Sequence, residues 1–203
     1  MALHTPVVNP ETGLITGAVQ TWSPNHNERP AGVTPDLLVL HGISLPPGEF
    51  GGQGVHQLFT NTLDPADHPY YAGIADLRVS AHLFLRRDGT LFQYVPLHRR
   101  AWHAGRSSWC GRDECNDYSI GIELEGCDDV PYSERQYAVL GPLCGAILRA
   151  YPAMTRERVV GHSDIAPGRK TDPGAAFDWY RLGREIDRAT GERWRGATDT
   201  TQR

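Results

Sequence analysis

The sequence predicts a single α/β domain in which helices cover a mixed central β-sheet. The chain has 203 residues, of which 39% are hydrophobic and 22% are charged, so it can build one core. Five short apolar or alternating runs are typical of strands, and three other segments favour helices. Because strands and helices share one stretch of chain with no visible linker, we expect one domain.

The first half of the chain combines one predicted strand and one predicted helix with long connections. Residues 1–34 are rich in Pro, Asn and Thr, and we expect them to wrap the surface. The apolar run 36–41 is typical of a buried strand. A loop over 43–54, rich in Gly and Pro, leads to a short helix at 55–61 and a second loop at 64–75. Connections of this length are often functional, so we expect them to form walls of a cleft.

The middle of the chain predicts most of the sheet. Residues 79–85 and 90–95 flank Arg87-Asp88-Gly89, which is a signal for the turn of a β-hairpin. The segment 119–125, Ser-Ile-Gly-Ile-Glu-Leu-Glu, alternates and predicts another strand. A short apolar run at 159–162 predicts the last strand, and a loop rich in Pro and Gly follows it.

Two helices are predicted in the last third of the chain. The first covers 133–151, with Ser133 as its N-cap and Pro152 beyond its end. The second covers 177–188. The expected organisation is therefore a surface segment at 1–34, the folded domain at 35–189 and a polar tail at 190–203.

Charge and composition exclude several classes of protein. The net charge of −4 argues against a general nucleic-acid binder. No apolar run approaches the about 18 residues of a membrane helix, and the first residues resemble no secretory signal. We therefore expect a cytoplasmic monomer without nucleic-acid or membrane partners, whose four cysteines are reduced.

Three residues form a candidate metal site. His41 and His162 each end an apolar strand, and a strand end delivers a side chain to the rim of a sheet from a rigid support. Asp172 follows ten residues after His162. Two imidazoles and one carboxylate can bind zinc and leave a fourth position for water. The spacing is not diagnostic, because histidines at strand ends are also common as hydrogen-bonded structural residues.

Two acidic residues are candidates for a general base. Glu123 and Glu125 alternate on one predicted strand, so they face the same side. One of them could take a proton from an attacking water, while the alternative is a solvated strand face. The sequence alone leaves the choice between them open.

The single lysine has an unusual setting. The chain has nineteen arginines and one lysine, Lys170, which lies two residues before Asp172. A compact ammonium at this place could stabilise the oxyanion that forms when an amide is attacked. The alternative is an ordinary surface lysine.

Four other basic side chains are weaker candidates. We expect His82 to pack within its strand, and His103 to line a site rather than to bind a metal. We expect Arg106 and Arg112 to face solvent.

Taken together, the motifs resemble the zinc-dependent N-acetylmuramoyl-L-alanine amidases of bacterial peptidoglycan recycling. Two of the matching segments are Ser119-Ile-Gly-Ile-Glu-Leu-Glu-Gly126 and Arg169-Lys-Thr-Asp-Pro-Gly174, and the combination of motifs is far more specific than any one of them. Further matching segments are residues 41–52, 68–73, 78–82, 87–89, 101–105, 115–117 and 161–162. The resemblance runs from about residue 20 to about residue 185, and it implies the fold shared by bacteriophage amidases and peptidoglycan recognition proteins.

The resemblance implies a reaction and assigns roles to residues. It implies hydrolysis of the amide between the lactyl group and L-alanine in 1,6-anhydro-N-acetylmuramyl peptides, with one Zn²⁺ per chain. The alternative is a non-catalytic module that binds peptidoglycan fragments. The implied roles are zinc ligation by His41, His162 and Asp172, acid/base catalysis by Glu123, oxyanion stabilisation by Lys170, a place near the reacting groups for Tyr70, and substrate contacts for Arg78 and Trp102.

The chain departs from the family pattern at two positions. Gly42 stands where an asparagine is expected after the first histidine, which removes an amide that could hydrogen-bond near the metal ligands. Glu114 stands where a basic residue is expected, which changes the charge available to a substrate carboxylate.

Overall fold

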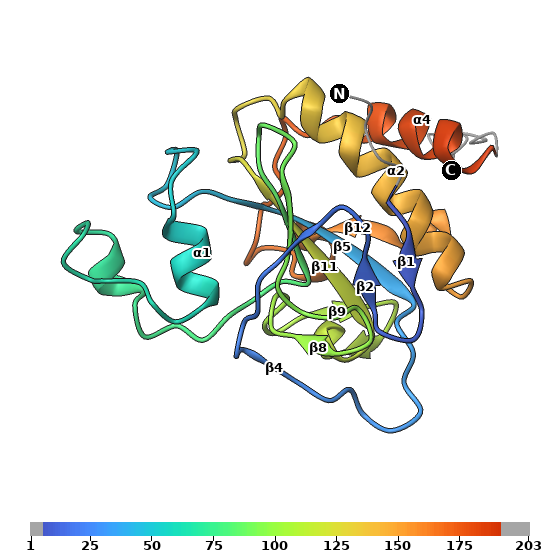
Figure 1. The fold of residues 1–203 in the computed structure, drawn as a ribbon, viewed down its shortest axis with the longest axis horizontal. Coiled ribbons are helices and arrows are strands. Elements are labelled where there is room, and N and C mark those ends of the chain that lie inside the picture. Colours follow the sequence, from blue (N-terminus) through green and yellow to red (C-terminus); the bar gives the residue numbers. More distant parts are fainter. Residues whose placement is uncertain (1–5, 192–203) are drawn as a thin grey trace.

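The core of the molecule is a six-stranded sheet in the order β12-β5-β11-β6-β7-β3. The computed structural model describes residues 6–191. Strands β12, β5, β11 and β6 are parallel to one another, β7 is antiparallel to β6, and β3 is parallel to β7. The predicted mixed sheet is therefore confirmed (Figure 1). The strands are β3 (Val19–Gln20), β5 (Leu37–Ile43), β6 (Leu83–Leu85), β7 (Leu91–Gln93), β11 (Ser119–Glu125) and β12 (Val159–Gly161).

Helices cover the sheet from both sides. In Figure 1, α2 and α4 lie together along one side, while α1 lies apart from them. The helices are α1 (Gly54–Phe59), α2 (Glu134–Ala150), α3 (His162–Ile165) and α4 (Trp179–Thr190). Among the described residues, seven strands have only two residues each. Of these, β3 lies at the edge of the main sheet, and the others are β1 (Val8–Asn9), β2 (Leu14–Ile15), β4 (His26–Asn27), β8 (Arg100–Ala101), β9 (Ser108–Trp109) and β10 (Arg112–Asp113).

The alternation of side chains on β11 divides the two faces of the sheet. Ile120, Ile122 and Leu124 are fully buried in the core that contains α2 and α4. Because successive side chains point to opposite faces, Glu123 and Glu125 face the other way. Strand β5 is divided in the same manner, with Leu38 and Leu40 in the core under α2. One face of the sheet therefore supplies stability and the other is available for polar groups.

The helix α2 begins and ends where the sequence predicts. The Ser133 side chain accepts a hydrogen bond from the Gln136 backbone N–H at 3.1 Å, and the Gln136 side chain accepts one from the Ser133 N–H at 2.9 Å. This capping box satisfies two N–H groups at the helix start. The helix ends at Ala150, with Tyr151 as its C-cap and Pro152 beyond it.

The structure differs from the sequence predictions in several places; for example, the strand predicted over 79–85 is shorter, because β6 covers only Leu83–Leu85. The segment 1–34 does more than wrap the surface, because β3 joins the main sheet and Ile15 is 2% exposed within the core. The strand predicted over 159–162 ends at Gly161, and His162 begins the short helix α3. The last helix starts at Trp179, two residues later than predicted, because the Asp178 side chain caps it.

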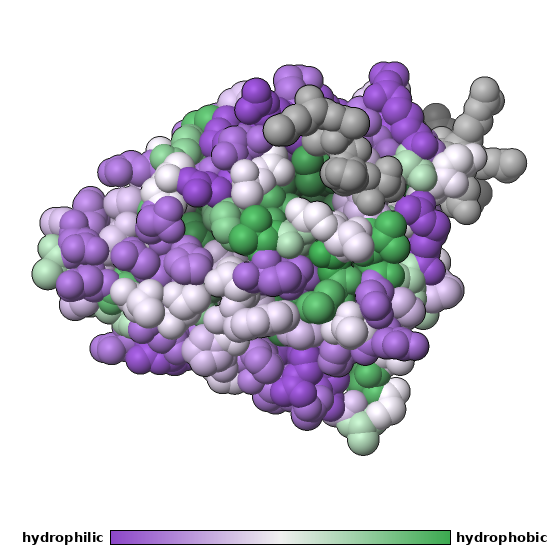
Figure 2. Space-filling model, viewed as in Figure 1, coloured by the Kyte–Doolittle hydropathy of each residue, from purple (hydrophilic) through white to green (hydrophobic). Residues whose placement is uncertain are grey.

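The face of the molecule seen in Figure 2 is mostly polar. In Figure 2, hydrophilic residues cover much of the outline and apolar residues gather toward the middle of the view. Among residues 6–191, no helix has the length and apolar character needed to cross a membrane. Most of the predicted tail at 190–203 lies outside the described residues.

The contact between α2 and α4 predicts different effects of two glycine substitutions. A Cβ added at Gly141 would lie 2.3 Å from the Cβ of Glu185 and 2.9 Å from its carbonyl carbon, so α4 would have to move. We expect Gly141→Ala to lower the free energy of unfolding by about 1–3 kcal/mol, although alanine favours helix. Gly145→Ala is the matched control, since its nearest neighbour would be the Ala189 Cβ at 3.2 Å. Urea unfolding of both variants tests this, and equal stabilities would contradict it.

Candidate active site

The register between β5 and β11 places the first two site residues side by side. Glu123 pairs with His41 in the parallel ladder, and both side chains lie on the face away from α2. Glu123 Oε1 lies 4.0 Å from His41 Nδ1. His41 is 1% exposed and Glu123 is 9% exposed. The sheet therefore holds a buried imidazole beside a buried carboxyl.

His162 and Asp172 complete a cluster with His41. His162 begins α3, directly after β12, and the backbone N–H of Ser163 donates to the carbonyl of Asp172 at 3.0 Å, which ties the following loop to the helix. The Nδ1 atoms of His41 and His162 are 3.0 Å apart. Asp172 Oδ2 lies 3.2 Å from the first and 3.1 Å from the second. The three predicted ligand residues therefore converge through one atom each.

The three converging atoms are better explained as ligands of one metal ion than as hydrogen-bond partners of one another. His162 Nε2 lies 3.0 Å from the Ala104 carbonyl, which only accepts, so Nε2 carries the hydrogen and a neutral ring presents a lone pair at Nδ1. That lone pair faces a carboxylate oxygen, and the two repel each other unless a cation lies between them. A tetrahedral zinc ion with bonds of about 2.0–2.2 Å needs its donors about 3.3 Å apart. The residues present fit such an ion.

Burial sets the protonation of the two residues that pair across the sheet. Complete burial lowers the pKa of His41 to about 4, despite the opposing effect of Asp172, so the ring is neutral at pH 7. Burial, followed by the negative charge of Asp172, raises the pKa of Glu123 well above its usual value. Glu123 Oε2 is buried and has no hydrogen-bond partner among the described residues. A buried, unpartnered carboxyl of raised pKa beside a candidate metal site has the properties of a general base.

The two acids of β11 make different contacts. Glu125 accepts hydrogen bonds from the backbone N–H of Gly51 at 2.6 Å and of Arg87 at 3.0 Å. These contacts tie the loop after β5 and the β6–β7 hairpin to the end of β11. Glu125 is therefore a structural clamp, while Glu123 is the acid that faces the cluster.

For His103, the sequence predicted only that it lines a site, and the structure shows its contacts. It is 8% exposed, and its Nδ1 lies 2.9 Å from His41 Nε2. Burial, followed by the neighbouring His41 and His82 rings, holds the pKa of His103 well below its usual value, so this ring is neutral. His82 is fully buried as expected and accepts a hydrogen bond from the Gly121 backbone N–H.

Lys170 lies near the cluster and is exposed. Its backbone N–H donates to the Ala166 carbonyl at 3.0 Å. Its charge acts to lower the pKa of both Glu123 and His41, so the ammonium is within electrostatic reach of both side chains.

Of the three remaining predicted residues, Tyr70 and Arg78 lie in the segment between α1 and β6, and Trp102 contacts β4. Tyr70 lies just before the turn Tyr71–Gly73 and is 46% exposed. The exposed Arg78 donates to the Ala75 and Leu77 carbonyls. The half-buried Trp102 donates through Nε1 to Asn27 Oδ1 at 2.7 Å. Their roles toward a substrate stay predictions.

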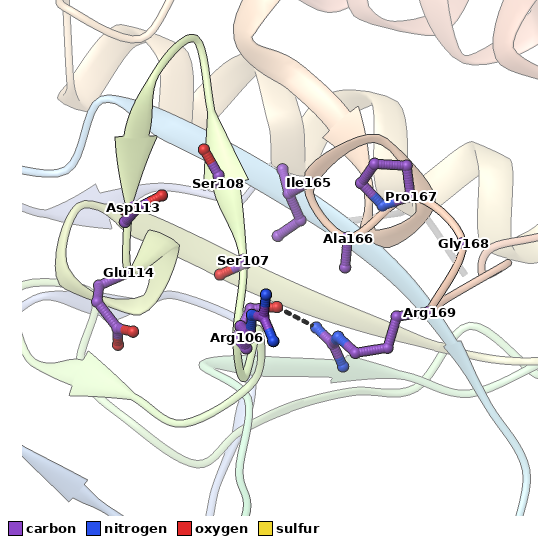
Figure 3. Close-up of a pocket in the computed structure, with 10 residues that line it drawn as sticks. All are labelled: Arg106, Ser107, Ser108, Asp113, Glu114, Ile165, Ala166, Pro167, Gly168 and Arg169. Carbon is purple, nitrogen blue, oxygen red and sulfur yellow. Dashed lines mark hydrogen bonds between the residues drawn. The ribbon is translucent and has the colours of Figure 1, made fainter.

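A groove of about 760 Å³ lies beside α3. In Figure 3, residues of the β9–β10 hairpin face Pro167 and Arg169 across it. The Arg169 guanidinium donates to the carbonyls of Ala104 and Arg106. The residues that line the groove are Arg106, Ser107, Ser108, Asp113, Glu114, Ile165, Ala166, Pro167, Gly168 and Arg169.

The two departures from the family pattern have visible surroundings. The Tyr132 hydroxyl occupies the space beside Gly42, where a Cβ would lie 2.4 Å from it, and donates to the Pro173 carbonyl at 2.9 Å. Tyr132 therefore supports the residue that follows Asp172. Glu114 lines the groove, and its carboxylate lies 3.7 Å from Arg100.

Comparison with known proteins identifies the family that this fold and cluster define. The family model described as N-acetylmuramoyl-L-alanine amidase matches residues 31–175. The chain belongs to the N-acetylmuramoyl-L-alanine amidase family. The predicted enzyme class is thereby confirmed.

Within this family, the chain is similar to the AmpD amidases. It is 55% identical over 172 residues to the 1,6-anhydro-N-acetylmuramyl-L-alanine amidase AmpD of Escherichia coli (strain K12), which covers 85% of this chain and 93% of the relative. A crystal structure of a selenomethionine AmpD derivative has a TM-score of 0.84 at 53% identity, covering 86% of this chain and 97% of that one. The predicted resemblance and fold are confirmed.

A more distant structure contains a substrate. It is the complex of the N-acetylmuramyl-L-alanine amidase AmiD from E. coli with anhydro-N-acetylmuramic acid-L-Ala-D-gamma-Glu-L-Lys. It has a TM-score of 0.55 at 28% identity, and the match covers 91% of this chain and 66% of that chain.

The different surroundings of the two acids predict opposite effects on stability. We expect Glu125→Gln to lower the free energy of unfolding by about 1–3 kcal/mol, because one of the two backbone N–H groups that it binds loses its acceptor. A carboxyl whose pKa is higher in the folded state destabilises that state as the pH rises above its unfolded value of about 4.3. Glu123→Gln removes this cost, so the metal-free variant should be at least as stable as wild type at pH 7. Urea unfolding at pH 7 distinguishes the two, and equal losses would contradict both assignments.

Proposed function

We propose that this chain uses one zinc ion to hydrolyse the amide between the lactyl group and L-alanine in 1,6-anhydro-N-acetylmuramyl peptides. The observation that carries the proposal is the convergence of His41, His162 and Asp172 beside the unpartnered carboxyl of Glu123. The similarity to AmpD and the anhydromuramyl peptide bound by AmiD support the choice of substrate.

The zinc ion would be held by His41 Nδ1, His162 Nδ1 and Asp172 Oδ2. When bound, zinc polarises the amide carbonyl and lowers the pKa of a coordinated water toward about 7. The protein holds its three ligands on a strand end, a helix start and a loop that are tied together by hydrogen bonds.

Glu123 would move the proton in this reaction. Its carboxyl is buried, and Oε2 has no partner among residues 6–191, so this atom is free to accept a proton from the attacking water. The raised pKa of Glu123 suits a group that also returns a proton to the leaving amine at neutral pH. The β5–β11 ladder fixes its distance from His41.

Lys170 would offset the negative charge on the tetrahedral oxygen. Its electrostatic effect on both Glu123 and His41 supports this role, and one donor of this kind is typically worth about 10²–10³ in rate. Tyr70, Arg78 and Trp102 would contribute on the walls around the substrate, where the resemblance assigns them.

We place the reaction in the cytoplasm, as part of peptidoglycan recycling. All four cysteines lie in the described part of the chain and are free, which suits a reducing compartment. The substrate named for AmpD is a fragment rather than intact cell wall.

The metal proposal predicts the behaviour of one ligand variant. We expect Asp172→Ala to lose zinc on dialysis, because only two neutral imidazoles remain to hold it. Asp113→Ala, an acid in the exposed β9–β10 hairpin, is the control and should keep the wild-type zinc content. Elemental analysis gives zinc per chain, and full zinc content in Asp172→Ala would show that the ligand set is wrong.

The reaction itself is tested with defined substrates. Zinc-loaded protein is incubated with muropeptides that carry either the anhydro or the ordinary muramic sugar, and the products are weighed by mass spectrometry. We expect release of free peptide from the anhydro form, and Glu123→Gln should keep its zinc but lose about 10²–10⁴ in rate. Binding without cleavage by the wild type would instead indicate a non-catalytic fragment-binding module.

A further inference from the structure

His103 lies directly behind one of the proposed metal ligands. Its two ring nitrogens have one contact each: Nδ1 lies 2.9 Å from His41 Nε2, and Nε2 lies 3.1 Å from Ser119 Oγ. The ring crosses β11 at Gly121, where a Cβ would lie 2.4 Å from the His103 ring. The glycine in the middle of a buried strand therefore makes room for this ring.

One carbonyl sets the direction of the hydrogen bonds along this chain of contacts when both rings are in a neutral tautomer. The Ser119 hydroxyl donates to the Cys115 carbonyl at 2.5 Å, because a carbonyl can only accept. Ser119 Oγ must then accept from His103 Nε2, so in the neutral tautomer Nε2 carries the hydrogen. His103 Nδ1 is left as an acceptor, and its donor is His41 Nε2. His41 is thus left with an unprotonated Nδ1, which points at His162 and Asp172.

The residue after His103 does the same for the second histidine. The Ala104 carbonyl accepts from His162 Nε2 at 3.0 Å, so Nδ1 is the nitrogen that remains to bind a metal. Asn116 Oδ1 holds both residues of this pair, since it accepts from the backbone N–H of His103 at 3.0 Å and of Ala104 at 2.8 Å. One clamped dipeptide thus faces both imidazoles.

We propose that the dipeptide His103-Ala104, clamped by Asn116 and relayed through Ser119 to the Cys115 carbonyl, is a positioning element that fixes both metal-binding histidines in the tautomer whose Nδ1 can ligate zinc. His103 acts through His41 and is not itself a ligand. The inference rests on the proposed zinc site. Such outer partners of metal ligands typically contribute 10- to 100-fold in metal affinity, so about that loss is expected when the relay is broken.

The hydrogen bond between the two histidines has a direct spectroscopic signature. In zinc-loaded protein labelled with ¹⁵N-histidine, a nitrogen–nitrogen coupling across the hydrogen bond should join His41 Nε2 to His103 Nδ1, with the proton on His41. A proton found on His103 Nδ1 would overturn the proposal. This measurement uses the wild-type chain and needs no variant to fold.

A pair of isosteric variants separates the hydrogen bond from packing. His103→Leu removes the acceptor, and we expect zinc affinity, measured by competition with a chromophoric chelator, to fall about 10- to 100-fold. His103→Asn returns an acceptor oxygen near the position of Nδ1, and it should recover most of that affinity. Equal affinity of wild type and His103→Leu would overturn the proposal while leaving the zinc site intact, whereas a wild type that binds no zinc would overturn the proposed function.

Ser119 offers a test at one remove from the ligands. Ser119→Ala deprives His103 Nε2 of its acceptor, so zinc affinity should fall by about tenfold although no ligand contact changes. Ser23→Ala is the matched control, because the Ser23 hydroxyl also donates to a carbonyl, that of Phe59, at 2.5 Å but serves no histidine. The two variants should lose similar stability, and an equal effect on zinc affinity would count against the relay.

Discussion

The site depends on the parallel pairing of β5 with β11. This ladder places His41 directly beside Glu123, and it does so on the face of the sheet that α2 does not cover. A shift of one residue in either strand would turn the histidine or the acid into the apolar core. The leucines and isoleucines that alternate with these polar residues along β5 and β11 fix the register, because each is fully buried on the opposite face. The packing that stabilises the sheet thus also sets the distance between a ligand and the proposed base.

Burying polar side chains on one face of the sheet costs free energy. Most of these side chains are satisfied by hydrogen bonds to residues far away in the sequence. The carboxylate of Glu125 accepts hydrogen bonds from the backbone of two distant loops. The two ring nitrogens of His103 contact Ser119 and His41. A buried polar group without a partner costs about 1–3 kcal/mol, so an exception is informative. Glu123 Oε2 is such an exception in the described part of the chain, and it lies where the proposed chemistry needs an acceptor.

Much of this could be predicted from the sequence, and what could not has a common cause. Strand ends identified His41 and His162, and the alternation of β11 showed that its two acids face one way, because these are local properties of the chain. The pattern could not choose between Glu123 and Glu125, since Glu125 is distinguished only by partners 74 and 38 residues away. For the same reason His103 was placed only near a site: its partner His41 lies 62 residues away. The resemblance to a family supplied the choice of Glu123, and the different contacts of the two acids support that choice as a proposal.

The Ala104 carbonyl has a consequence for how variation in this chain should be interpreted. It orients His162 through the backbone, so an alanine carries a function that its own side chain does not encode. A mutational scan would detect only steric limits at this buried position, while the loss of orientation would show at Asn116, whose amide oxygen sets the backbone in place. Tolerance maps that score side chains one at a time would therefore assign the effect to a residue twelve positions away along the chain.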